Sequence, residues 1–276
     1  NAWAEVTPFS ESYSSTSATT GWSSSTGGRF TPTILNESDN YFLSVTQSER
    51  NNNGATVTGN ILSGKAKAGD DYTLIFDMRI RSHSDGNKGS AVLSIKDAAG
   101  SGYILRMADG GSNSTSWNVN ETSTNVTLPG SNANSIDGIT WCTYKISRSG
   151  VYTYLTITNK STGADILART SIGGASATGG LGNIVFETSR YNANFAIDNI
   201  VLRAIEDGDV PVATPTSYTI HFKNESSTTI KDDVVINTLV GSTVNADDYL
   251  TSIYTGGKKY IYKSGNTPIE AVEDAA

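Results

Sequence analysis

Few side chains in this sequence have the types and spacing that catalysis requires. The two histidines, His83 and His221, are far apart, and no G-x-S-x-G turn is present to offer a nucleophilic serine. The zinc motifs H-E-x-x-H and paired cysteines are absent. The glutamates also lack the Glu-x-Asp-x-x-Glu spacing that places two carboxylates on one strand face for glycoside hydrolysis. We therefore expect no catalysis in this chain, although a lyase site built from residues distant in sequence stays open.

Other side chains suit binding better than catalysis. A sugar ring has an apolar face and a rim of hydroxyl groups, so its site needs exposed aromatic rings beside Arg, Asp, Asn or Gln. Strand alternation and loop position select the following candidates for carbohydrate binding: Asp77, Arg79, Arg106, Trp117, Tyr152, Tyr154, Arg190 and Tyr191. Trp117 is included because it stands in an otherwise polar run. The alternative for each candidate is an ordinary sheet residue, with Tyr packed across strands and Arg solvated.

Period-two alternation predicts the strands that hold these residues. In residues 72–81 one face is apolar, and the opposite face carries Asp77 and Arg79 toward water or a ligand. Similar runs are 91–96, 103–107, 141–147, 151–158, 182–188 and 195–203, with turn residues between them. Many short strands at this spacing predict an antiparallel β-sandwich or jelly roll over residues 1–203. We expect the following residues to be buried between its two sheets: Leu74, Phe76, Met78, Leu93, Ile95, Leu155 and Ile157.

The alternation breaks after residue 203. Residues 204–217 hold two prolines and three acidic residues, which is typical of a linker. Strands are predicted again at 218–223, 233–240 and 259–263, with one short helical turn at 245–250. The fold class is therefore all-β, with a small, mostly β domain at 218–276 behind the sandwich.

Composition and charge exclude several classes of protein. The net charge is −7 and no Lys/Arg run occurs, so we expect no nucleic-acid partner. No apolar run approaches the length of a membrane span, so we expect no membrane insertion. The single cysteine, Cys142, cannot form an internal disulfide, and its strand pattern predicts a packed hydrophobic residue. Because the chain starts at Asn1, we expect that a leader was removed or that the segment belongs to a longer protein. One thiol without disulfides is typical of extracytoplasmic proteins of anaerobic bacteria, so we expect a secreted or cell-surface bacterial protein. As an isolated module it is expected to be monomeric.

Two short motifs at the ends of the first domain carry a resemblance. Phe9-Ser10-Glu11 and Gly21-Trp22 stand near its start, and the run from Phe195 to Leu202, with Asp198-Asn199 in it, closes it. Through them, residues 9–203 resemble concanavalin A-like jelly rolls, in particular the laminin-G-like and carbohydrate-binding modules of bacterial polysaccharide-degrading enzymes. The resemblance implies a non-catalytic module that binds a plant cell-wall polysaccharide for a secreted enzyme. The alternatives are an adhesin or spacer that docks host glycoprotein or protein, and a polysaccharide lyase or hydrolase.

The resemblance also implies a structural calcium ion. Asp198 alternates with Ala196, Ile200 and Leu202, so we expect it to point inward, where a carboxylate needs a partner or a metal. Glu11 is the matching candidate ligand from the first strand, and the alternative is a hydrogen-bonded Asp without an ion. Residues 217–276 are similar, through Tyr218-Thr-Ile-His-Phe, to the mucin-binding-protein-like repeats of gut-bacterial surface proteins.

Overall fold

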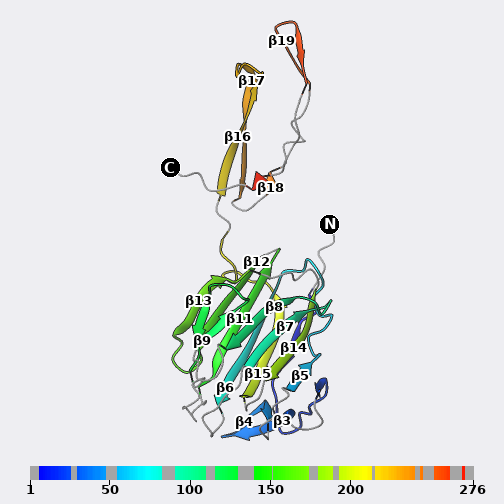
Figure 1. Ribbon diagram of the computed structural model, residues 1–276, viewed down its shortest axis with the longest axis vertical. Helices are drawn as coiled ribbons and strands as arrows, with labels where there is room; N and C mark the ends of the chain where they lie inside the picture. The colour runs from blue at the N-terminus through cyan, green and yellow to red at the C-terminus, as the bar shows by residue number, and fades with distance from the viewer. Residues whose placement is uncertain are drawn as a thin grey trace. The chain divides into compact units, whose positions relative to one another are not determined.

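The computed structural model divides the chain into two units, Asn1–Val210 and Pro211–Ala276, which are treated separately below. The structure describes the following residues: 6–25, 30–47, 55–82, 91–109, 116–129, 140–150, 152–173, 180–188, 193–212, 215–239, 243–244, 252–261 and 269–270. Every regular element in these ranges is a strand, and all strand pairs are antiparallel (Figure 1), as the alternation predicts. Within the same ranges, no helix is long and apolar enough to cross a membrane.

The larger sheet of the first unit has eight strands. Its order is β13-β12-β11-β6-β15-β4-β3, and β1 pairs with β15 beside this path. The strands are β1 (Phe9–Glu11), β3 (Phe30–Glu37), β4 (Asn40–Gln47), β6 (Tyr72–Ser82), β11 (Cys142–Ser149), β12 (Tyr152–Asn159), β13 (Asp165–Ser171) and β15 (Ala193–Ala204). Pro32 lies on β3 at the end of the order, where a residue without an N–H is tolerated.

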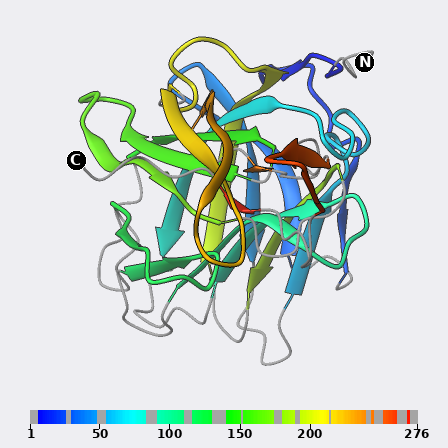
Figure 2. The same ribbon diagram turned by 90° about the horizontal axis from the view of Figure 1, so that it is seen from above.

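The smaller sheet of the first unit has seven strands in the order β10-β9-β8-β7-β14-β5-β2. They are β2 (Trp22–Ser24), β5 (Ala55–Gly59), β7 (Ala91–Asp97), β8 (Tyr103–Asp109), β9 (Ser116–Val119), β10 (Asn125–Thr127) and β14 (Leu181–Thr188). The two sheets form a sandwich, seen from above in Figure 2. Consecutive strands pair or switch sheets, so segments far apart in sequence become neighbours, as β6 does between β11 and β15.

One apolar cluster fills the space between the two sheets. All seven residues predicted for the core are buried in it: Leu74, Phe76, Met78, Leu93, Ile95, Leu155 and Ile157. Aromatic rings add to it, for example Phe76 stacked on Tyr144 with centroids 5.1 Å apart. Cys142 is buried too, and this burial raises the pKa of its thiol to about 11, so the thiol is inert at neutral pH.

The described residues of the second unit form three pairs of antiparallel strands. The longest pair is β16 (Pro215–Lys223) with β17 (Thr229–Leu239), and His221 Nδ1 lies 2.8 Å from Asp233 Oδ2 on this pair. The remaining pairs are β18 (Thr243–Val244) with β21 (Ile269–Glu270), and β19 (Ile253–Thr255) with β20 (Lys258–Tyr260). The predicted helical turn at 245–250 lies outside the described residues.

The end of the first unit differs from the predicted linker. Strand β15 continues to Ala204, and the first unit extends to Val210. Residues 205–209, which we call the strap, pack onto the larger sheet through Asp209, which is only 3% exposed. The acidic residues of this segment predicted a solvated linker, but Asp209 forms ion pairs with Lys145 and Arg203 of the sheet.

Candidate binding face

The larger sheet has an outer face, turned away from the core, on which most of the candidate residues lie. Along β6, β11 and β12 the inward residues are apolar or small and buried, and the alternate residues form the outer face. The outer-face residues used below are Thr73, Asp77, Arg79, Thr143, Lys145, Ser147, Tyr152, Tyr154, Thr156 and Thr158. Asp77 and Arg79 have the predicted side of β6, but each is only 5% exposed because other side chains cover it. They therefore lie on the outer side of β6, as predicted, but neighbouring side chains separate them from water.

Asp77 is the centre of a polar cluster. Its Oδ1 accepts a hydrogen bond of 2.6 Å from the Thr143 hydroxyl, and its Oδ2 accepts one of 2.8 Å from the Asn199 amide. The Lys160 ammonium, which is half exposed, pairs with the same Oδ2. Asp77 is thus a neutralised anchor that fixes the turn after β12 and the bulge of β15 on the sheet.

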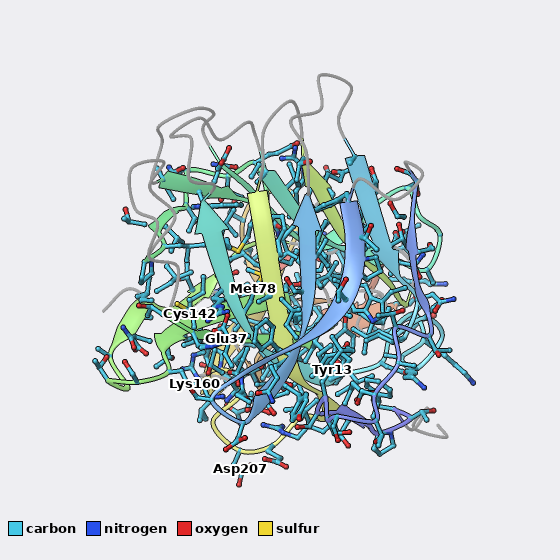
Figure 3. All side chains as sticks on the ribbon, turned by 90° about the horizontal axis from the view of Figure 1, so that it is seen from below. Tyr13, Glu37, Met78, Cys142, Lys160 and Asp207 are labelled. Atoms are coloured by element: carbon cyan, nitrogen blue, oxygen red, sulfur yellow. The ribbon has the colours of Figure 1, made fainter. Side chains whose placement is uncertain are left out.

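Arg79 lies between two aromatic rings. Its Cζ is 4.8 Å from the ring centroid of Phe42 and 5.0 Å from that of Trp141, a geometry that favours cation–π attraction. Its Nη2 donates to Glu37 Oε1 over 2.6 Å. Glu37 and Lys160 lie on the same side of the sandwich (Figure 3), and Trp141 is partly exposed beside them. At the end of the outer face where β11 begins, the partly exposed Trp141 therefore lies beside the charged groups of Arg79, Glu37 and Lys160.

Asp198 also belongs to the outer face, not to the core as predicted. It pairs in register with Asp77, and a bulge follows between Asp198 and Val201, where Asn199 has a φ of 51°. The bulge inserts one residue, so Ile200 and Leu202 turn inward while Asp198 stays outside. Burial raises the pKa of Asp198, although backbone N–H groups of Asn199 and Tyr13 and the Lys160 charge oppose the shift.

Glu11 and Asp198 do not fit a calcium ion. Calcium takes roughly six to eight oxygen ligands, usually with several carboxylates. Asp198 Oδ1 already accepts two backbone N–H groups, at 2.8 and 3.4 Å, and the neighbouring Asp77 already has three donors. Over the described ranges, no three Asp, Glu, His or Cys side chains gather as a metal site. The positive charge at this cluster comes from Lys160.

The exposed Tyr152 and the half-buried Tyr154 form an aromatic pair at the other end of β12. Their ring centroids are 6.5 Å apart with an interplanar angle of 26°, and Tyr152 is 42% exposed. Thr156 and Thr158 follow on the same face. The pair offers apolar ring surface to solvent beside a row of hydroxyl groups.

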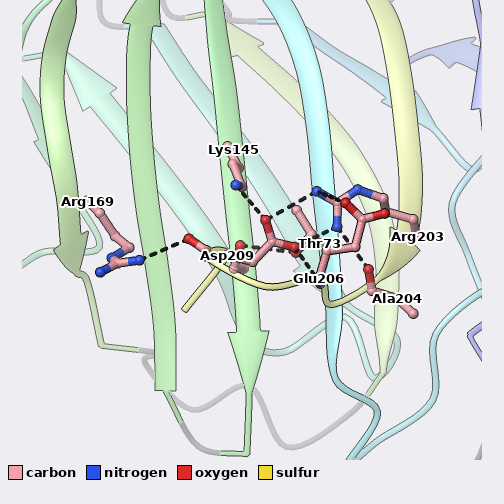
Figure 4. A network of polar contacts seen from close by, with 9 residues as sticks. Thr73, Lys145, Arg169, Arg203, Ala204, Glu206 and Asp209 are labelled. Atoms are coloured by element: carbon pink, nitrogen blue, oxygen red, sulfur yellow. Dashed lines mark hydrogen bonds and ion pairs between the residues drawn. The ribbon is translucent and has the colours of Figure 1, made fainter. Parts of the chain in front are cut away.

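The strap crosses the outer face near the start of β6 (Figure 4). Asp209 Oδ1 lies 2.5 Å from Lys145 Nζ, and Oδ2 accepts bonds from Arg203 at 2.5 Å and Thr73 at 2.8 Å. The backbone N–H of Glu206 adds a further donor at 2.9 Å. Burial alone would raise the pKa of this carboxyl, but these hydrogen bonds outweigh it and hold the pKa well below its usual range.

The remaining candidates do not join the outer face of the larger sheet. Trp117 is 1% exposed in the core, because it alternates inward with Val119 on β9. Arg106 lies on the outer face of the smaller sheet, where it pairs in register with Ser94 of β7. Its Nη1 lies 3.4 Å from Glu121 Oε1. Arg190 and Tyr191 lie outside the described residues. Sequence reasoning missed Trp141, although it has the same parity as Thr143 and Lys145 and so could have been placed on the polar face.

Comparison with known proteins adds structural relatives only. No protein-family model matches this chain, and no curated protein sequence matches it. A CBM2 module of Lactobacillus casei BL23 phage J-1 evolved Dit is 12% identical, with 73% of this chain and 99% of that chain covered and a TM-score of 0.46. Alginate lyase Aly36B is 18% identical, with 74% of this chain and 99% of that chain covered and a TM-score of 0.41. The Ulex europaeus lectin UEA-II is 8% identical, with 72% of this chain and 99% of that chain covered and a TM-score of 0.45. We therefore argue function from the side chains of the outer face.

Proposed function

We propose that the first unit is a non-catalytic carbohydrate-binding module whose site is the outer face of its larger sheet. The observation that carries this proposal is the stacked pair of the exposed Tyr152 and the half-buried Tyr154 on a face otherwise rich in hydroxyl groups. Aromatic rings pack against the apolar face of a sugar, and fixed polar groups bind its hydroxyls. Exposed apolar rings cost solvation, so such a pair is favoured where a ligand covers it.

The outer face of β12 offers room for sugar rings on both sides of the strap. The eight residues of β12 cover about 25 Å at roughly 3.3 Å per residue. The strap lies near the middle of this length, where Asp209 contacts Lys145, the partner of Thr156 on β12. Tyr152 and Tyr154 lie at one end of this length, and Lys160 with the partly exposed Trp141 lies at the other. The natural ligand in this proposal is a plant cell-wall polysaccharide, bound outside the cell for a secreted bacterial enzyme.

Affinity electrophoresis against pectins, xylans, mannans and mixed-linkage glucans tests the proposal. We expect at least one polysaccharide to retard the protein. Tyr152→Ala should lose about 2 kcal/mol of binding free energy, roughly thirtyfold in affinity, because truncating an aromatic anchor removes its stacking surface. Arg106→Ala is the matched control, since this residue lies on the opposite sheet.

Two results would contradict the proposal. If Arg106→Ala lost affinity while Tyr152→Ala bound like the parent, the site would lie on the smaller sheet. If no polysaccharide on a broad array bound the parent while glycoproteins or proteins did, the adhesin hypothesis would replace it. Release of reducing ends or unsaturated products from any of the polysaccharides would instead indicate a hydrolase or lyase.

A further inference from the structure

The charged groups on the outer face bear on which glycans it can accept. A polyuronate presents a carboxylate on every sugar, and proteins bind carboxylates with Arg or Lys, most strongly when two N–H groups of Arg reach one carboxylate. Four described cations that contact carboxylates on the outer face or at its end are Arg79, Lys145, Lys160 and Arg203. Their availability decides whether an acidic chain can bind.

Each of these four cations is paired with a carboxylate of the protein itself. Arg79 pairs with Glu37, and Lys160 pairs with Asp77. Lys145 and Arg203 share Asp209. On β13, Arg169 donates to the backbone carbonyl of Gly208 over 3.0 Å, so the strap engages this cation too. The net charge of −7 adds a general repulsion of polyanions.

The contact with Asp209 has the composition of a carboxylate receptor. Thr73, Lys145 and Arg203 come from the neighbouring strands β6, β11 and β15, and all three direct donors at one carboxylate, Arg203 with two N–H groups. Thr73 is fully buried and bonds to Ser147, so the floor of the receptor is fixed. The strap delivers the Asp209 side chain into this place from a segment that follows β15 directly.

We infer that the outer face takes an uncharged glycan, and that Asp209 keeps polyuronates out by occupying a carboxylate receptor made by Thr73, Lys145 and Arg203. This inference rests on the proposed carbohydrate binding and adds the chemical class of the ligand. Asp209 is attached within a few residues of the receptor, so its effective concentration is about millimolar or higher, and a free carboxylate competes poorly with it. Lys145 and Arg203 keep part of their exposure, but their charges are already balanced by Asp209.

The test compares glycans that differ only in charge. The neutral polysaccharides xylan, glucomannan and mixed-linkage glucan are used beside polygalacturonate and alginate. Glucomannan and glucan are also oxidised at their primary hydroxyls to carboxylates. We expect the parent to bind at least one neutral polysaccharide, and to bind polygalacturonate, alginate and the oxidised chains at least about tenfold more weakly.

Asp209→Ala tests the role of the strap. It should open the receptor and give binding of polygalacturonate or alginate that the parent lacks, while Glu206→Gln, which changes an exposed strap carboxylate 3.4 Å from Arg203, should not. If Asp209→Ala does not fold, Asp209→Ser tests the same gain, because its shorter side chain also leaves the receptor open and its hydroxyl keeps one polar group at this place.

The outcomes separate this inference from the proposed function. Equal or tighter binding of the acidic chains by the parent overturns the uncharged-ligand inference, while carbohydrate binding stands. Exclusion of polyuronates by a folded Asp209 variant, to the same degree as by the parent, overturns the role of Asp209. No binding of any polysaccharide by the parent ends the proposed function and this inference with it.

Discussion

Replacing Asp209 with Asn should destabilise the first unit measurably. Asn keeps the shape of Asp and one acceptor oxygen, but it removes the charge that Lys145 and Arg203 share. Removing one partner of a fully buried ion pair costs about 3–5 kcal/mol. Here the side chains of Lys145 and Arg203 keep 34% and 24% of their exposure, so water compensates part of the loss. We expect a decrease of about 2–3 kcal/mol in the free energy of unfolding.

The pH dependence of this effect follows from the lowered pKa of Asp209. Its carboxyl has a folded-state pKa below the unfolded value of about 3.9, so its contribution is complete above roughly pH 5. The contribution is lost as the pH falls below the unfolded pKa and through the folded one. The difference in stability between the parent and Asp209→Asn should therefore be smaller at pH 3 than at pH 7.

Thermal unfolding followed by calorimetry measures both the loss of stability in Asp209→Asn and its dependence on pH. In a domain of this size 1 kcal/mol shifts the Tm by about 2–4 °C, so the variant should melt roughly 5–10 °C below the parent at pH 7. Glu206→Gln is the control, and it should stay within about 0.5 kcal/mol, because its partner contact is at the surface. A variant with the Tm of the parent, or a difference that does not change between pH 7 and pH 3, would refute the reasoning.

Three further predictions concern other parts of the first unit. Trp117→Ala should lose about 3–5 kcal/mol of stability without changing the glycan affinity of the folded protein, because Trp117 is buried in the core; intact stability with lost binding would contradict its position. Asp198→Asn should be more stable than the parent at pH 7 and not at pH 3, because a carboxyl with a raised folded pKa loses its contribution as the pH rises; equal stability at both pH values would disprove this. EDTA should change the Tm of Glu11→Gln and of the parent by the same amount, since Glu11 and Asp198 do not fit calcium, and a smaller change in the variant would show that Glu11 holds an ion.

The sequence by itself determined the all-β class, the central strands of both sheets and the side on which most of their residues lie. Successive residues of a strand point to opposite faces, so alternation alone places Leu74 and Phe76 inward and Tyr152 and Tyr154 outward, whatever the strand order. The same rule could have placed Trp117 inward with Val119, but its polar neighbours were given more weight. A pattern of period two needs no knowledge of the partners of a strand, which explains why the fold class and the core were predictable.

Only the tertiary structure decided which outer-face residues are accessible. Asp77 and Arg79 are covered by Lys160, Asn199 and Glu37, whose distance along the chain gives no local signal. A bulge at Asn199 shifts the phase of β15 by one residue, so the alternation from Ile200 backward assigned Asp198 to the wrong face. In the sequence the strap has the composition of a linker. Its attachment depends on the attraction between Asp209 and the cations Lys145 and Arg203, which come together only when β11, β6 and β15 have paired.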